Sequence, residues 1–214
     1  MQERVGIFGG TFDPIHYGHL RVAEEVREML TLEKVVFIPA YVQPLKSDLS
    51  PAEPTHRLKM ARLSVADNSL FDVDDCEICR GGASYTVDTI EHFRKNNKRT
   101  SLFLILGSDA WLNITHWYDY RRLFELSEVV VMTRPGYDAA SIDKILPLEL
   151  AKRFCYDGER FAYSANSGVR FVSVTWLDIS GTLIRKRCME GKSIKYLVHP
   201  EVEKYILKER LYTQ

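Results

Sequence analysis

Residues 4–20 read RVGIFGGTFDPIHYGHL, and this stretch joins a short apolar run to two glycines, an Asp-Pro pair and two histidines. The apolar run over residues 4–8 predicts a buried strand, and a helix-like pattern starts at Gly18. Gly9 and Gly10 follow the strand directly, where the backbone must either turn sharply or approach a ligand closely. Taken alone, the glycines fit a plain strand-to-helix turn and a ligand-binding turn equally well.

The rest of the chain continues this alternation of strands and helices. Near-continuous apolar strands between amphipathic helices are typical of a parallel sheet that is covered on both faces. We therefore expect an α/β fold, with a Rossmann-like, doubly wound and mostly parallel sheet. Residues 138–168 have the weakest pattern, and we expect a helix and a variable loop there. The further predicted strands are 34–39, 70–73, 101–106, 128–133 and 169–174; the predicted helices are 18–30, 54–66, 85–96, 182–189 and 200–209.

The composition is that of an ordinary globular protein. The chain has 214 residues, is 45% hydrophobic and has a formal net charge of zero. This length suits one core, so we expect a single domain over residues 1–214. Zero net charge argues against a nucleic-acid partner, and no apolar stretch approaches the roughly 18 residues of a membrane span. We expect a cytoplasmic protein with no membrane partner; a homo-oligomer is compatible with the sequence.

The four cysteines do not predict a metal site. Cys76 and Cys79 form a C-x-x-C pattern, but no second pair exists at similar spacing. A structural zinc site normally needs two more ligands, and a redox motif usually begins a helix. We interpret the pair as ordinary strand or loop cysteines and expect no protein-bound metal.

Parallel sheets bind ligands at the carboxyl ends of their strands, near a topological switch point. The loops to search are therefore 9–19, 39–46, 107–117 and 134–137. In the first of these, His16 and His19 are three residues apart at a helix start and can face one side. Such a place suits an anion, which the imidazoles could hold as donors. A capping histidine and a metal pair with Asp13 are the alternatives, but two histidines with Thr11 and the glycines favour phosphate binding.

Residues 9–19, GGTFDPIHYGH, resemble the (H/T)-x-G-H signature of nucleotidyltransferases, and in detail that of bacterial nicotinate-nucleotide adenylyltransferases. The resemblance covers nearly the whole chain. Later segments also resemble family motifs: GGASYTVDT at 81–89, LGSDA at 106–110, RPGY at 134–137, ISGTLIR at 179–185 and YLVHP at 196–200.

Two departures from the family pattern stand out. Residues 43–46 read QPLK where the family usually has P-P-H-K, so Leu45 replaces a histidine. Gly181 stands where the family has the second serine of I-S-S-T. We expect weaker contacts to the triphosphate and retained activity.

The resemblance implies transfer of AMP from ATP to nicotinate mononucleotide, which gives deamido-NAD and pyrophosphate, with Mg²⁺ bound mainly through the ATP phosphates. It also implies that a helical portion at about 178–214 completes the ATP site. The implied catalytic residues are Thr11, His16, His19, Lys46 and Arg185. The implied ATP-binding residues are Gly9, Gly10, Phe12, His16, Gly18, His19, Gly107, Asp109, Ile179, Ser180, Thr182 and Arg185. The implied residues for the mononucleotide are Tyr85, Thr86, Trp117, Tyr118 and Arg134.

Several alternatives stay open from the residues themselves. Lys46 and Arg185 could be solvated surface charges, Asp109 could cap the helix that follows it, and Trp111 is expected in the core rather than in the pocket. The substrate could be nicotinamide mononucleotide or phosphopantetheine. A regulator that binds nucleotide without turnover, and an RNA-binding protein, are the remaining readings; zero net charge disfavours the last.

Overall fold

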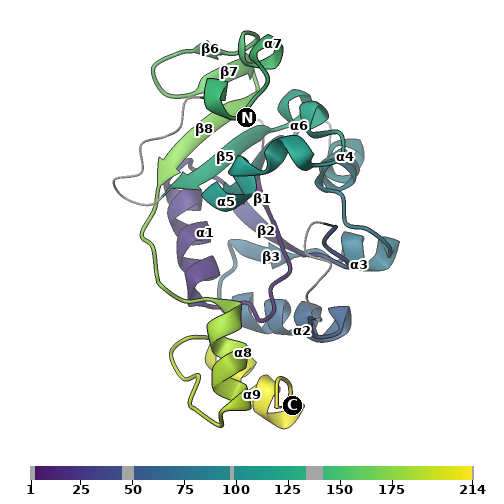
Figure 1. Cartoon of the computed structure of the whole chain (residues 1–214), viewed down its shortest axis with the longest axis vertical. Coiled ribbons are helices and arrows are strands. Elements are labelled where there is room, and N and C mark those ends of the chain that lie inside the picture. The colour runs from purple at the N-terminus through teal and green to yellow at the C-terminus, as the bar shows by residue number, and fades with distance from the viewer. Residues whose placement is uncertain (1–2, 45–50, 97–98, 134–141, 214) are drawn as a thin grey trace.

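The computed structural model describes residues 3–44, 51–96, 99–133 and 142–213, and the account below concerns these residues. They form an eight-stranded sheet in the order β3-β2-β1-β4-β5-β8-β7-β6, with helices on both faces (Figure 1). The fold is the α/β, Rossmann-like, mostly parallel fold that the sequence predicts. The strands are β1 Arg4–Gly10, β2 Lys34–Pro39, β3 Phe71–Val73, β4 Ser101–Gly107, β5 Glu128–Thr133, β6 Cys155–Tyr156, β7 Phe161–Ser164 and β8 Ser167–Ser173.

The helices follow the predicted order, with additional short ones between β3 and β5. The α-helices are α1 Tyr17–Met29, α2 Pro54–Val65, α3 Cys76–Arg80, α4 Thr86–Asn96, α5 Ser108–Leu112, α6 Tyr120–Leu126, α7 Leu148–Ala151, α8 Gly181–Met189 and α9 Pro200–Lys208. Two 3-10 helices are η1 Ile114–His116 and η2 Ile142–Lys144.

The sheet separates two apolar cores. Along β2, Phe37 belongs to one core, whereas Val36 and Ile38 belong to the other. The first core lies under α1, α2, α8 and α9, and the second under α4, α5 and α6. Because successive side chains of a strand point to opposite faces, a strand buried on both sides must be apolar throughout.

The order in which strands are added to the sheet reverses at β1. This strand pairs in parallel with β2 on one side and with β4 on the other. After β1, the chain adds β2 and β3 on one side of β1, and it then adds β4, β5 and β8 on the other side. The carboxyl ends of β1 and β4 therefore mark the switch point where such folds bind ligands.

The prediction for residues 138–168 was wrong in its second half. The described part contains η2, α7 and the strands β6 and β7, which extend the sheet: β7 pairs antiparallel with β8, and β6 pairs antiparallel with β7. Glu128 at the start of β5 anchors this extension by ion pairs to Arg160 at 2.6 Å and Arg170 at 2.8 Å. These partners are far apart in the chain, so local periodicity does not reveal them.

The interpretation of Cys76 and Cys79 as strand or loop residues was also wrong, because both lie in α3. Neither thiol is activated by its surroundings: burial raises the pKa of Cys76, and the Asp75 carboxylate raises the pKa of Cys79. Nucleophilic cysteines need a lowered pKa. Among the described residues, no three His, Cys, Asp or Glu side chains gather in a way that could hold a metal ion.

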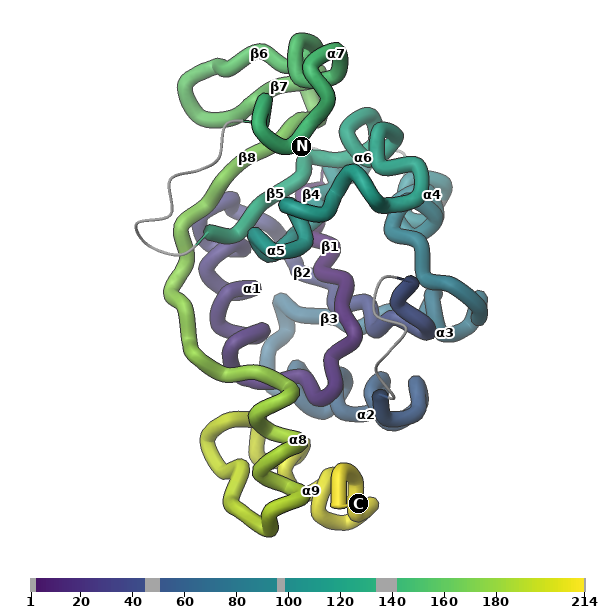
Figure 2. Tube along the Cα trace, viewed as in Figure 1, coloured from purple at the N-terminus to yellow at the C-terminus, as the bar shows by residue number. Residues whose placement is uncertain are grey.

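The chain returns to the switch point through its C-terminal part. Figure 2 shows the segment after β8 passing beside α1 before it enters α8. The Glu25 carboxylate of α1 holds this segment by accepting the Thr175 N–H at 2.6 Å. Near the end of the C-terminal part, the Tyr212 hydroxyl donates to Asp13 Oδ1 at 2.6 Å. No helix built by the described residues is long and apolar enough to cross a membrane.

Candidate active site

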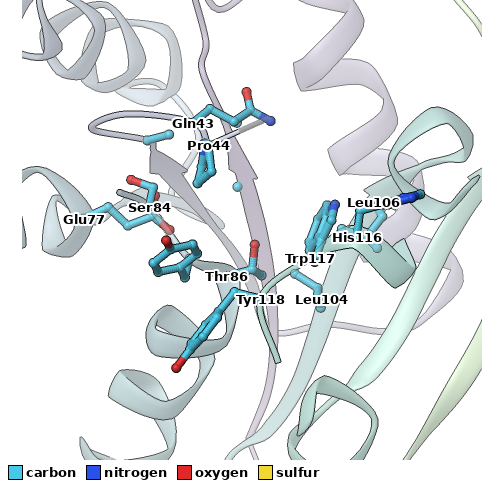
Figure 3. A pocket seen from close by; sticks show the side chains of 14 residues that line it. Gln43, Pro44, Glu77, Ser84, Thr86, Leu104, Leu106, His116, Trp117 and Tyr118 are labelled. Carbon is cyan, nitrogen blue, oxygen red and sulfur yellow. The ribbon is translucent and has the colours of Figure 1, made fainter. Parts of the chain in front are cut away.

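A cavity of about 320 Å³ lies at the carboxyl ends of β1, β2 and β4. Gln43 and Pro44 lie over one end of it, Glu77 and Ser84 on one side, and Trp117 opposite them (Figure 3). The remaining lining residues are Gly9, Gly10, Ala40, Tyr85, Thr86, Leu104, Leu106, His116 and Tyr118. The cavity thus combines apolar walls with a few polar groups, as is typical of small-molecule sites.

The two glycines at the end of β1 still belong to the strand, and neither has a positive φ. A Cβ on Gly9 would meet nothing within 4 Å, so packing alone does not require a glycine there. Both glycines line the cavity. The two glycines therefore do not form the turn itself: Gly10 makes room for the Phe12 ring, and the open space above Gly9 leaves room for a ligand against the backbone.

The two signature histidines stack on each other at the start of α1, with ring centroids 3.7 Å apart. His16 occupies the N-cap position, and His19 Nδ1 accepts the His16 backbone N–H at 3.3 Å. This bond assigns the proton of a neutral His19 ring to Nε2, which makes Nε2 a donor. Capping and ligand binding are therefore compatible: one nitrogen of His19 helps to close the helix end, and the other nitrogen carries a proton to donate.

His16 is buried, with 6% of its surface exposed, and its Nδ1 has no hydrogen-bond partner among the described residues. Burial lowers the pKa of His16 from 6.5 to about 4. The ring is consequently neutral at physiological pH, so it can act as a neutral donor or acceptor but not as a fixed cation. Because an unpaired buried polar atom is costly, His16 is a strong candidate for a group that is completed by a ligand.

Gly18 is required by the packing of His16. A Cβ at this position would lie 3.0 Å from His16 Nδ1 and 3.7 Å from the carbonyl oxygen of Ile179. Gly18 therefore leaves room for the His16 ring, and the carbonyl of Ile179 in the ISGTLIR motif lies near Gly18 at the start of α1.

Gly181 has an equivalent steric role at the start of α8. A Cβ there would lie 2.7 Å from the Asp13 carbonyl oxygen, closer than real Cβ contacts occur. The replacement of the family's serine by Gly181 therefore does more than remove a hydroxyl. In this chain the glycine allows α8 to pack directly against the backbone of residue 13.

The polar side chains of α8 mainly hold one another and the β1–α1 loop. Arg185 Nη1 donates to the Asp13 carbonyl oxygen at 2.6 Å and lies 3.3 Å from Asp13 Oδ2. Its Nη2 donates to Thr182 Oγ1 at 3.2 Å, and Ser180 Oγ accepts the Leu183 N–H as a helix cap. Arg185 is therefore not a solvated surface charge.

Thr11 and Asp109 lie on opposite sides of the switch point. The Thr11 hydroxyl donates to Gln43 Oε1 at 2.6 Å, which ties the loop after β1 to the loop after β2. Asp109 is exposed in the first turn of α5, whose N-cap is Gly107. The capping alternative for Asp109 is therefore wrong.

The aromatic side of the cavity comes from α4 and the segment after η1. The rings of Tyr85 and Tyr118 lie 4.7 Å apart, and Trp117 and Thr86 are half-buried at the cavity wall. Trp111 is only 1% exposed and packs against Phe171, so it is a core residue as predicted.

Sequence reasoning missed several residues of this region. Glu77 is buried in the cavity wall, where burial raises its pKa and Thr89 donates to its Oε1 at 2.6 Å. His116 and Gln43 line the cavity, and the buried Arg57 lies behind the β1 loop. A single Glu or Arg in a predicted helix is normally a solvated surface charge, so the sequence offered no reason to place Glu77 or Arg57 at the site. The family motif at 81–89, which contains Ser84, was the one sequence feature that pointed to this part of the cavity.

Three residues singled out from the sequence lie outside the described residues. They are Leu45 and Lys46 of the loop after β2 and Arg134 of the RPGY segment.

Comparison with known proteins agrees with this geometry. Residues 7–187 match the family model described as cytidylyltransferase-like. The chain is thus a nucleotidyltransferase of the cytidylyltransferase-like class. It is 43% identical over 211 residues to the probable nicotinate-nucleotide adenylyltransferase of Geotalea daltonii, with 98% of each chain covered. The corresponding protein of Desulfatibacillum aliphaticivorans is also 43% identical, over 98% of this chain and 99% of its own length. The chain belongs to the nicotinate-nucleotide adenylyltransferase family.

Solved structures show the same fold at lower sequence similarity. The nicotinic acid mononucleotide adenylyltransferase of Plasmodium falciparum, solved as a complex with NaAD, superimposes with a TM-score of 0.71 at 20% identity. The match covers 98% of this chain and 97% of that one.

Proposed function

We propose that this chain transfers the adenylyl group of ATP to nicotinate mononucleotide, which gives deamido-NAD and pyrophosphate. The observation that carries this proposal is the stacked histidine pair at the switch point, of which His16 is buried, together with an aromatic cavity of about 320 Å³ at the carboxyl ends of the same strands. A nucleotidyltransferase needs these two parts side by side, because the phosphate that is attacked and the acceptor that attacks it must meet there.

In this reaction a phosphate oxygen of the mononucleotide attacks the α-phosphorus of ATP in line with the departing pyrophosphate. One P–O bond forms, one P–O bond breaks, and no covalent enzyme intermediate is needed. The protein has to hold two polyanions together and stabilise the charge that develops. His16, as a neutral ring, and His19 would donate to this charge, together with Thr11, Lys46 and the backbone of Gly9, Gly10 and Phe12.

The ATP subsite would extend from the histidines toward α5 and α8. We assign Gly107 and Asp109 to the nucleoside part, and Ser180, Thr182 and Arg185 to the phosphates, with Ile179 and Gly18 forming the wall beside the histidines. Arg185 and Tyr212 both bind Asp13 of the β1–α1 loop. This supports our proposal that residues 1–214 act as one nucleotidyltransferase domain, in which residues 178–214 complete the ATP site.

Mg²⁺ fits this arrangement as a companion of the nucleotide. Asp13, the carboxylate of the β1–α1 loop, is already engaged by Tyr212, by the Ala52 N–H at 3.1 Å and by Arg185. Mg²⁺ commonly binds through substrate phosphates with few protein ligands. Bound in this way, it would neutralise charge on the departing pyrophosphate.

The acceptor ring would bind between the aromatic side chains of the cavity. We assign stacking on the pyridine ring to Trp117, and recognition of the carboxylate to Thr86 and the backbone near Tyr118, with Tyr85 and Arg134 completing the subsite. The Glu77 carboxyl accepts a hydrogen bond from Thr89, and hydrogen bonding from Ser84 also favours its charged form.

The test is release of pyrophosphate from ATP and Mg²⁺ with either nicotinate or nicotinamide mononucleotide as acceptor. We expect a higher kcat/KM with the acid, because a site that hydrogen-bonds one functional group discriminates strongly against its absence. A higher value with the amide would overturn the choice of acceptor. Binding of ATP without any pyrophosphate release would instead indicate a nucleotide-binding regulator.

A further inference from the structure

Arg57 is a fully buried cation directly behind the β1–α1 loop. Its side chain is carried by α2 and the residue is only 1% exposed. The guanidinium donates to four backbone carbonyl oxygens: those of Ala52 at 2.9 Å, Thr11 at 2.8 Å, Ala40 at 2.6 Å and Tyr41 at 3.0 Å. The other buried residues of α2 are Met60, Ala61, Ser64 and Val65, whereas the apolar Leu58 and Leu63 are only half-buried.

The four carbonyls belong to the segments that build the candidate site. Thr11 lies in the loop after β1, Ala40 and Tyr41 follow β2, and Ala52 precedes α2. Ala40 lines the cavity, and so does Gln43, which accepts the Thr11 hydroxyl. Arg57 therefore connects the loop after β1 to the loop after β2 from inside the protein.

The bond to Thr11 also fixes a donor that points the other way. The Thr11 carbonyl and the Phe12 N–H belong to one planar trans peptide unit, so they point in opposite directions. When Arg57 holds the Thr11 oxygen, the Phe12 N–H must point away from Arg57. Phe12 adopts a φ of +50°, a conformation that a bulky residue keeps only when its surroundings enforce it.

The charge of Arg57 is only partly balanced. A guanidinium stays protonated even when burial lowers its pKa. The guanidinium donates its hydrogen bonds to carbonyls of the described residues rather than to carboxylates. Asp13 is the largest favourable charge acting on it, but Asp13 also pairs with Arg185 at 3.3 Å. Glu53 adds a smaller favourable charge, so the carboxylate nearest to both arginines is shared between them, and we expect a positive potential behind the loop that is expected to bind phosphates.

We propose that Arg57 is a positioning residue of adenylyl transfer, which holds the loops after β1 and β2 in register and adds a buried positive charge behind the phosphate-binding backbone. The proposal rests on the function proposed above. Arg57 touches no reacting atom; it acts through the Thr11–Phe12 peptide and through Ala40 and Tyr41.

Arg94 offers a matched control within the same chain. It lies on α4 and donates to the carbonyls of Leu126 and Thr100, both at 2.7 Å, and burial lowers its pKa as well. These carbonyls precede β5 and β4, at the amino ends of the strands and opposite to the cavity. Arg94 therefore has the same kind of structural role as Arg57 without access to the site.

The experiment compares Arg57→Lys and Arg57→Met with Arg94→Lys and Arg94→Met. For each variant, kcat and both KM values are measured per folded molecule, together with Tm and the Kd of inorganic pyrophosphate. We expect Arg57→Lys to keep pyrophosphate binding within a few-fold, because its charge remains, while kcat falls about 10- to 100-fold through misplaced loops. Arg57→Met should lose both, whereas the Arg94 variants should change only Tm.

The lysine variant keeps the test decisive if Arg57→Met does not fold. Equal kcat and pyrophosphate affinity in wild type and Arg57→Lys, with only a lower Tm, would reduce Arg57 to a structural residue and overturn the proposal. Failure of wild type to release pyrophosphate from ATP would refute the proposed function separately. In that case, weaker pyrophosphate binding in Arg57→Met than in Arg94→Met would still support the charge role, and equal binding or no binding by wild type would refute it.

Discussion

The two halves of the candidate site are built in different ways. On the phosphate side, around the start of α1, Asp13 and His16 are buried, and partners from distant parts of the chain hold Asp13: Arg185 and Tyr212 bind it across 172 and 199 residues. The acceptor side uses short elements and exposed rings, and Tyr118 is 62% exposed. The difference indicates that the half facing the reacting phosphorus is preorganised, whereas the half facing the acceptor ring is open to it.

Preorganisation matters most where charge develops. Donors that are already fixed in position need not reorganise when the transition state forms, and they act more strongly in a low-dielectric surrounding. The ring of the acceptor has no such requirement, because stacking tolerates small displacements. Substitutions on the phosphate side should therefore lower kcat, and substitutions on the acceptor side should raise KM.

The largest expected effect is that of His19→Ala. Loss of a preorganised donor should lower kcat about 100-fold or more. The matched control is His199→Ala, because His199 is the N-cap of α9 and its Nδ1 accepts the Glu201 N–H at 3.2 Å. Its loss should cost about 1 kcal/mol of unfolding free energy and leave kcat unchanged. Steady-state kinetics and denaturant unfolding measure both; if His19→Ala behaves like His199→Ala, the signature histidine is only a cap.

How far the sequence predicts this phosphate side depends on the range of the contacts. Residues 35–39 read VVFIP, an apolar run that follows two charged residues and ends at a proline, and β2 was predicted with the ends that the structure shows. The i, i+3 spacing of the histidines likewise predicts a common face. Arg57 could not be predicted, because its four acceptors come from residues 11, 40, 41 and 52, and only the folded chain brings them together. The same holds for β6 and β7, whose anchor Glu128 precedes them by more than two dozen residues.

Gly181→Ser is the next test, because it restores the residue that the family pattern favours. If the glycine were only a missing hydroxyl, the serine should improve ATP binding. The structure predicts the opposite: a Cβ placed 2.7 Å from the Asp13 carbonyl oxygen must push α8 away and displace Arg185. We expect kcat to fall by roughly tenfold or more. A serine variant with a lower KM for ATP and unchanged kcat would contradict the close packing of α8 on residue 13.

On the acceptor side, Trp117→Ala should raise the KM for the mononucleotide roughly tenfold, since stacking of a base on an aromatic side chain contributes about 1–3 kcal/mol. The KM for ATP and the Tm should change little, because Trp117 is half-buried at the cavity wall. Trp111→Phe is the control: because Trp111 is fully buried, this substitution should lower Tm and leave both KM values unchanged. The reverse pattern would exchange the roles of the two tryptophans.

The smallest expected effect is a pH dependence that arises on the phosphate side of the site. The pKa of His16 is 6.5 when the chain is unfolded and about 4 in the fold, so the unfolded chain binds the proton more tightly. The stability contributed by neutral His16 is therefore fully present above about pH 6.5 and is lost as the pH falls toward 4. Relative to pH 7, about 2 kcal/mol should be lost at pH 5, and His16→Gln should lack this slope in denaturant unfolding.

Over the same range kcat should not rise on acidification near pH 6.5, because His16 donates as a neutral ring; a rise that disappears in His16→Gln would mean that the phosphate side works with a cationic histidine.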